Sequence, residues 1–192
     1  LVQVMWNFLE WKRFSMSNLR LINETTTTVT NLINITDVFS ADFDIYKIVI
    51  SGLNQDTNVA NEINGIRFIN SSGSVISSSD YDYAVLEMKS AGSYFDNKST
   101  TASAIFMGQR ADQVGDGSNS TVFYVFNPFS LSYTFTISQS ASFDGSENNI
   151  NGKGIGVLHQ TNSITGFQIY DSDSGRPFES GSKIITYGLA VN

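Results

Sequence analysis

The chain has 192 residues, of which 41% are hydrophobic and only 15% charged, and its formal net charge is −7. The length suits one domain with a sizeable core, and an acidic chain lacks the basic stripe that binding nucleic acid needs. The absence of cysteine excludes disulfides and thiol chemistry. No apolar run approaches the roughly 20 residues that a membrane-spanning helix needs, so we expect no membrane insertion.

Residues 1–17 are predicted to form an N-terminal arm or extension. They hold both tryptophans, and the stretch from Trp6 to Phe14 has the spacing of a short helix. One interpretation is an arm that docks on a neighbouring subunit through large apolar side chains. The other is upstream sequence that does not belong to the protein. The candidate interface residues of the arm are Trp6, Phe8, Leu9, Trp11 and Phe14.

Residues 18–192 are predicted to fold as one β domain, because short strand-like runs alternate with turn signals. Residues Tyr133, Phe135 and Ile137 alternate with threonines, which is typical of a one-sided strand with its apolar face on the core. The predicted strands are Thr25–Thr28 (an edge strand or connector), Ile45–Ile50, Gly65–Ile69, Tyr81–Met88, Ala104–Gly108, Thr121–Phe126, Ser132–Ser138, Ile155–His159, Gly166–Tyr170 and Lys183–Ala190. The predicted loops are Asn54–Asn61, Asp112–Asn119 and Phe143–Gly154.

Two parts of the chain, about a hundred residues apart, have similar sequence patterns. The stretches Ile63–Tyr83 and Ile164–Tyr187 each contain a glycine-opened strand, a Ser/Asp/Gly turn and a second run that ends at tyrosine. We expect the two units to be similar hairpins in one sandwich. The fold predicted for residues 18–192 is therefore all-β, a two-sheet antiparallel β-sandwich of jelly-roll type.

Four stretches of strand and turn pattern carry a likeness to known proteins. They are Asp44–Ile50; Gly65–Phe68 with Ser71–Gly73 and Tyr81–Ala84; Phe126–Pro128; and Ile164–Ile169 with Ser172–Gly175 and Ile184–Leu189. Through them the chain resembles a family of phage virion proteins, the tail-fibre or minor structural proteins of marine phages. The resemblance covers roughly residues 18–192. It implies a structural role on a particle and brings no catalytic residues with it.

Catalysis would need residues that the sequence supplies sparsely. His159 is the only histidine, and because it follows an apolar run it is predicted to be a strand-end residue rather than a catalytic base. Acidic pairs occur at Asp42/Asp44, Asp80/Asp82, Asp112/Asp116 and Asp171/Asp173. Such pairs are more often solvated turn acids than the facing carboxylates of a glycosidase. We therefore predict no catalytic residue and no enzyme.

Oxygen-rich loops are the candidate ligand sites. The run Asp171–Gly175 starts like a calcium loop but lacks the distal glutamate, and turn formation explains it without metal. We expect no cofactor, with calcium as the open alternative. The candidate ligand-loop residues are Asp112, Asp116, Asn119 and Asp144. Aromatic residues that would stack on sugars if exposed, and are otherwise expected in the core, are Tyr81, Tyr83, Tyr94, Phe95, Tyr170 and Phe178.

The function expected from these observations is that of a non-enzymatic phage virion structural protein, in the tail fibre, the tail or a decoration of the capsid surface. The expected location is the virion surface. The expected partners are other virion proteins and copies of the same chain, a trimer being one arrangement, with no nucleic acid and no membrane. The alternative is a receptor-binding adhesin that recognises host surface polysaccharide, and a depolymerase is the third hypothesis.

Overall fold

The structure is a computed structural model that describes residues 18–55, 62–111, 119–143, 148–171 and 177–190, and these contain strands and no helix. They form two antiparallel sheets, so the predicted all-β sandwich is confirmed. The large sheet contains β1 (Leu19–Thr26), β12 (Lys183–Leu189), β3 (Ile45–Ser51), β8 (Ser120–Phe126), β9 (Thr134–Phe143), β10 (Asn149–Leu158), β5 (Tyr81–Lys89) and β6 (Ser93–Ala102), in that order. The small sheet contains β2 (Leu32–Ile35), β11 (Ile164–Asp171), β4 (Glu62–Asn70) and β7 (Ile105–Ala111).

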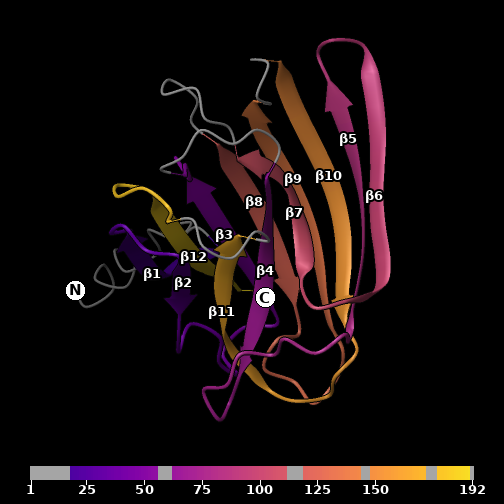
Figure 1. Cartoon of the computed structure of the whole chain (residues 1–192). Coiled ribbons are helices and arrows are strands. Elements are labelled where there is room, and N and C mark those ends of the chain that lie inside the picture. Colours follow the sequence, from indigo (N-terminus) through magenta and orange to yellow (C-terminus); the bar gives the residue numbers. More distant parts are fainter. Residues whose placement is uncertain (1–17, 56–61, 112–118, 144–147, 172–176, 191–192) are drawn as a thin grey trace, which may run out of the picture.

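The small sheet covers one face of the large sheet, and the core lies between them (Figure 1). Strand alternation builds this core, because every second residue of a strand points to the same face. In β3, for example, Tyr46, Ile48 and Ile50 are fully buried while the residues between them are partly exposed. Other fully buried large side chains are Tyr81, Phe123, Leu53, Ile66, Phe68, Phe167 and Phe178.

The two sequence units are similar, but they are not hairpins. In each unit the first strand belongs to the small sheet and the second to the large sheet: β4 is followed by β5, and β11 by β12. The first strands, β4 and β11, pair with each other in the middle of the small sheet. The hairpin prediction was therefore wrong, because the Ser-rich segment after each turn carries the chain across the sandwich.

One predicted loop is wrong, and two strands of the structure were not predicted. Phe143–Gly154 was predicted to be a loop, but β9 runs to Phe143 and β10 begins at Asn149, so the two long strands are adjacent and paired over ten residues. The loop was predicted from the glycines and asparagines of this region, but Gly152 and Gly154 lie in β10 and allow close packing. The strands β2 and β6 were not predicted, because β2 is only four residues long and β6 is mostly polar.

Small residues on β9 and β10 bring the sheets together at one place. The hydroxyl of Ser140 donates a hydrogen bond to the carbonyl of Gly108 on β7 and accepts one from the N–H of Gly152 (3.1 Å). A Cβ atom on Gly152 would lie 2.5 Å from the Gly108 carbonyl oxygen. Strand β7 therefore lies directly against the large sheet, and side chains larger than serine or threonine do not fit between them.

Candidate functional site

The face of the large sheet that points away from the small sheet is apolar over much of its area. On β9 the residues that alternate outward include Phe135, Ile137 and Phe143, and those that alternate inward are serine and threonine. Phe135 is 50% exposed and Ile137 is 45% exposed. The sequence predicted this strand's alternation correctly, but the expectation that its apolar face lies on the core was wrong.

The apolar residues of neighbouring strands line up with those of β9. Ile137 pairs with Tyr124 on one side and with Ile155 on the other, and Ile155, which is 61% exposed, pairs with Ala84. Residues opposite each other in a sheet share a face, so the four form one row. We call the surface built from this row and the two rows beside it the outer face; its apolar residues are Ile45, Val49, Ala84, Leu86, Val122, Tyr124, Phe126, Phe135, Ile137, Ile155 and Val157.

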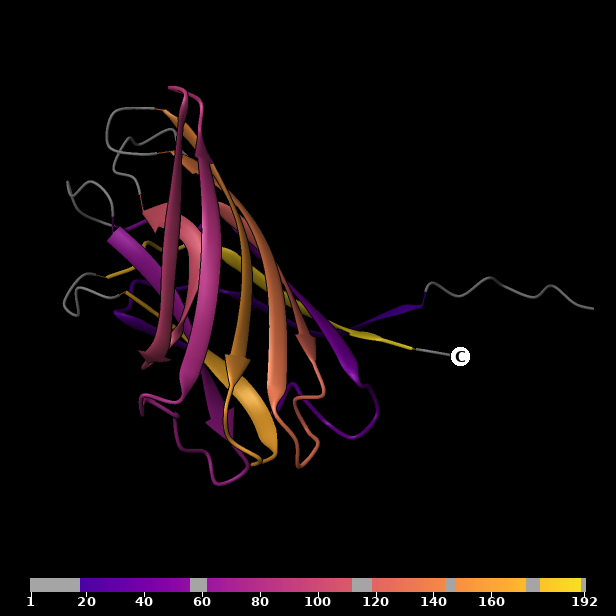
Figure 2. The same cartoon turned by 90° about the vertical axis from the view of Figure 1, so that its right-hand side faces the viewer.

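The outer face contains two hollows. The larger, about 500 Å³, runs across β8, β9, β10, β5 and β6, and its lining includes Phe126, Phe135, Ile155 and Ala84. The smaller, about 310 Å³, is lined by Val122, Tyr124, Lys153 and others. Ile137 lines both hollows and so stands as the ridge between them. The turned view in Figure 2 shows the strong twist of the large sheet that carries this surface.

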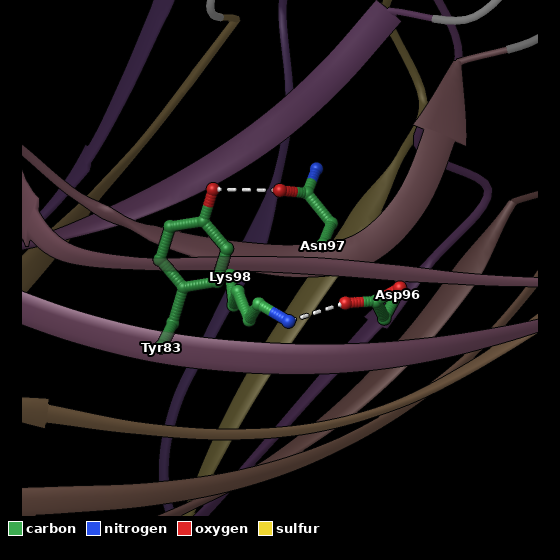
Figure 3. A network of polar contacts seen from close by, with 4 residues as sticks. All are labelled: Tyr83, Asp96, Asn97 and Lys98. Atoms are coloured by element: carbon green, nitrogen blue, oxygen red, sulfur yellow. Dashed lines mark hydrogen bonds and ion pairs between the residues drawn. The ribbon is translucent and has the colours of Figure 1, made fainter.

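Most charged residues of the outer face lie at its border, but Lys153 on the central strand β10 lies within it, beside Gln139. On β6, the edge strand, the ammonium group of Lys98 lies 2.8 Å from the carboxylate of Asp96 (Figure 3). On the opposite face of β5 and β6, which points toward the small sheet, the Tyr83 hydroxyl donates a hydrogen bond to the side-chain carbonyl of Asn97 (3.1 Å). Because both partners of the ion pair are well exposed, it contributes little stability by itself. An apolar centre with a polar border is typical of a docking surface.

The outward face of the small sheet is different in character. There the guanidinium group of Arg67 lies 3.8 Å from the centre of the Tyr170 ring and hydrogen-bonds the backbone carbonyl of Ser103. The amide of Gln168 donates to the side chain of Asn34 (2.9 Å). The polar side chains of this face are thus engaged with one another and with the backbone. The asymmetry assigns the candidate docking surface to the large sheet.

A second group of residues gathers at one end of the sandwich, where β10 ends and β5 begins. His159 follows β10, as the sequence predicts, and its Nε2 atom lies 2.9 Å from the carboxylate of Asp82. The exposed ring of Tyr133 meets the His159 ring edge to face, with centroids 5.2 Å apart. We call Tyr133, His159 and Asp82, with Ser78, Asp80 and Gln160 beside them, the end cluster.

In the end cluster, the carboxylates of Asp80 and Asp82 have separate partners. The Asp80 carboxylate accepts hydrogen bonds from Ser78 (2.5 Å) and from Gln160 (2.7 Å). The bond from Ser78 lowers the pKa of Asp80 most, the bond from Gln160 lowers it further, and partial desolvation opposes them. Asp80 is therefore a structural acceptor that orders the turn before β5.

Most of the predicted site residues lie outside the described residues. These are all five interface residues of the arm, Trp6, Phe8, Leu9, Trp11 and Phe14, and three ligand-loop residues, Asp112, Asp116 and Asp144. Asn119 is described and is fully buried, with its backbone carbonyl bonded to the N–H of Leu53. In the described ranges no three His, Cys, Asp or Glu residues gather as a metal site.

The aromatic residues considered for sugar stacking divide into three groups. Tyr81 and Phe178 are fully buried, as the core interpretation predicted, Tyr83 and Tyr170 are half-buried, and Tyr94 and Phe95 on β6 are exposed. Tyr133 was predicted only as part of an alternating strand, and neither it nor the outer-face residues of β8 and β10 were predicted as site residues. The sequence signal for the outer face is the excess of glycine on β10, which implies that the inner face there has no room for large side chains.

Comparison with known proteins finds no family model that matches this chain, and no curated protein matches it either. The described part of the chain contains no helix long and apolar enough to cross a membrane.

Proposed function

We propose that this protein is a non-enzymatic structural component of a phage virion and that it assembles through the outer face of its large sheet. The observation that carries the proposal is the apolar surface around Ile137 and Ile155, which are 45% and 61% exposed. Contiguous apolar surface of this kind with a polar border is typical of protein–protein contact. The resemblance to phage virion proteins supplies the setting, on the surface of the particle, among other virion proteins.

The arrangement of the sandwich supports an assembly role. The core between the sheets is closed by its own large side chains, such as Tyr46 and Phe123, so the outer-face residues are not needed to complete it. A chain that nevertheless carries Phe135, Ile137 and Ile155 outward exposes side chains whose burial is worth about 1.5–3 kcal/mol each. Burial in an assembly recovers this free energy.

The test of the proposal is to find the chain in the particle whose genome encodes it. An antibody raised against the purified protein should label intact, purified particles in electron microscopy, and the chain should co-purify with them in stoichiometric amount. Particles assembled with an Ile137→Asp, Ile155→Asp chain should lack the label. A chain that is abundant in the infected cell but absent from purified particles contradicts the proposal.

The second candidate function is a receptor-binding adhesin, and the end cluster is the observation that favours it. An exposed tyrosine ring beside hydrogen-bonded polar side chains is the kind of surface on which a sugar ring stacks and is hydrogen-bonded. The ring of Tyr133 and the carboxylate of Asp82 are both held in place by His159.

Binding to host surface polysaccharide, measured by calorimetry or on immobilised glycan, tests the adhesin hypothesis. Tyr133→Ala should abolish binding if this hypothesis is right, and Tyr94→Ala, at an exposed position on β6, is the matched control. Binding that is absent in the unchanged protein, or equal in both variants, contradicts the adhesin hypothesis and leaves the structural role.

A further inference from the structure

We infer that the outer face is covered by the outer face of a second copy of this chain, in a two-fold symmetric pair whose axis runs along the strands between β9 and β10. The inference rests on the proposed function, since it names the partner of the same surface. A two-fold interface uses the same patch on both subunits, so the patch must be complementary to itself. The outer face meets this requirement in shape and in area.

Shape complementarity follows from the order of residues in the central row. Ile137 and Ile155 are register partners on either side of the proposed axis, so a two-fold rotation places Ile137 of one copy opposite Ile155 of the other. One strand further out, Tyr124 on β8 and Ala84 on β5 exchange in the same way. A large ring thus meets the smallest side chain of the row. The Ile137 ridge of each copy enters the hollow that Ile155 and Ala84 line in the other.

The area is sufficient for a stable pair. Strands are spaced by about 4.8 Å and alternate residues by about 6.8 Å, so six strands and three rows measure about 29 by 20 Å. About 600 Å² of each copy is then covered in projection, and a pair covers about 1,200 Å², the lower bound of standard specific interfaces. The six strands from β3 to β6 lie three on each side of the axis, so the overlap is symmetric.

The border of the outer face brings charged groups together at both ends of the central row. The edge strand β6 of one copy comes opposite β3 of the other, so Lys47 lies opposite Lys98, and Asp96 lies one row away. Like charges directly opposite each other repel, and the Asp96 carboxylate, which is ion-paired with Lys98, is the group that offsets this repulsion. Charged groups at the rim remain in contact with water, so their pairing sets orientation more than affinity.

Residues 1–17 are a poorer match to this surface, although they are rich in tryptophan and phenylalanine. A helix with its side chains is about 10–12 Å wide, and an extended strand is narrower, so one such segment laid along the central row covers about half of the 20 Å height of the face. It would leave residues of the two neighbouring rows exposed. A second sheet covers all three rows.

The full chain should sediment, across a range of concentrations, at twice the 21.1 kDa mass of one chain. Ile137→Asp should raise the dissociation constant by about 30-fold or more, as expected for the centre of an interface. Ala84→Trp, which fills the hollow at an exposed position, should have the same effect without a change in the fold. Leu131→Asp, at a position 78% exposed in the turn before β9, is the matched control and should leave the mass unchanged.

Because the chain has no cysteine, introduced cysteines report the geometry directly. A mixture of Ile137→Cys and Ile155→Cys chains should be joined by a short bismaleimide into a covalent pair more efficiently than Leu131→Cys chains with either of them. Equal yields in both mixtures overturn the proposed axis. Circular dichroism of every variant establishes that the sandwich is retained.

The outcomes separate this inference from the proposed function. A full chain that is monomeric at all concentrations, or a trimer, overturns the two-fold pair, while labelling of particles still supports a virion role. A pair that is lost on deletion of residues 1–17 and unaffected by Ile137→Asp also overturns it, because the arm and not the sheet then makes the contact. A pair that forms as described in a protein absent from particles upholds the pair and contradicts the virion role.

Discussion

The hydroxyl of Tyr81 joins the two sheets through Phe68. Tyr81 begins β5 in the large sheet, and its hydroxyl accepts a hydrogen bond from the backbone N–H of Phe68 on β4 in the small sheet (2.9 Å). The same hydroxyl donates to the backbone carbonyl of Ile76 (2.9 Å), in the crossing segment between the two strands. The rings of Tyr81 and Phe68 also stack, with centroids 6.3 Å apart. One buried side chain therefore fixes the crossing of the first sequence unit.

Removing this hydroxyl should destabilise the fold. Tyr81→Phe keeps the ring but leaves the Phe68 N–H and the Ile76 carbonyl without this partner in the interior, so we expect a loss of about 2 kcal/mol in the free energy of unfolding. Urea denaturation followed by circular dichroism measures it. Tyr94→Phe, at an exposed position on β6, should change stability by less than about 0.5 kcal/mol. Equal losses in the free energy of unfolding for both variants would show that the hydrogen bonds of the Tyr81 hydroxyl contribute nothing to stability.

The buried hydroxyl of Tyr81 also predicts that the fold loses stability at alkaline pH. Burial raises the pKa of Tyr81 above its ordinary value of 10.0, which outweighs the hydrogen bond from Phe68 that lowers it. Above pH 10 the unfolded chain releases this proton and the folded chain keeps it. The stabilisation is thus complete below pH 10 and is lost as the pH rises, by at most about 1.4 kcal/mol per pH unit. Tyr81→Phe should show a shallower decline in urea titrations, and identical slopes would contradict the assignment.

Strand β10 should not tolerate a side chain at Gly152. A Cβ atom there would lie 2.5 Å from a backbone oxygen of Gly108, which is not the flexible end of a side chain and cannot move aside. We expect Gly152→Ala to cost about 1–3 kcal/mol through overpacking. Lys153→Ala, one residue along on the outer face, is the control and should be nearly neutral. Thermal melting of both variants against the unchanged protein decides whether β7 lies as close to β10 as described.

Because the apolar face of β9 points outward, alanine substitution should affect stability differently at two phenylalanines on paired strands. Phe123 on β8 is fully buried, whereas Phe135 on β9 is 50% exposed. In a background made monomeric by Ile137→Asp, Phe123→Ala should cost about 3–5 kcal/mol and Phe135→Ala less than about 1 kcal/mol. Urea denaturation measures both. A large loss for Phe135→Ala in the monomeric background would mean that its ring belongs to the core.

Much of the fold was predictable because strand alternation and turn residues are local properties. The runs Ile45–Ile50 and Thr121–Phe126 were predicted within a residue of β3 and β8. The end cluster was only partly predictable. His159 was expected at a strand end, but its contact with Asp82 requires β10 and β5 to be neighbours, although the two residues lie far apart in the chain. No local sequence pattern indicates a contact between two residues so far apart in the chain.

The sequence by itself determined the alternation of β9, the composition of its two faces and the class of the fold, since a period of two in polarity is compatible with a strand and not with a helix. It did not determine which face of β9 is buried. That was decided by the tertiary structure, where β7 lies against Gly152 and Ser140 and leaves room only for small side chains. Steric exclusion on the inner face therefore outweighs the usual burial of apolar residues, and it turns Phe135 and Ile137 outward to form the outer face.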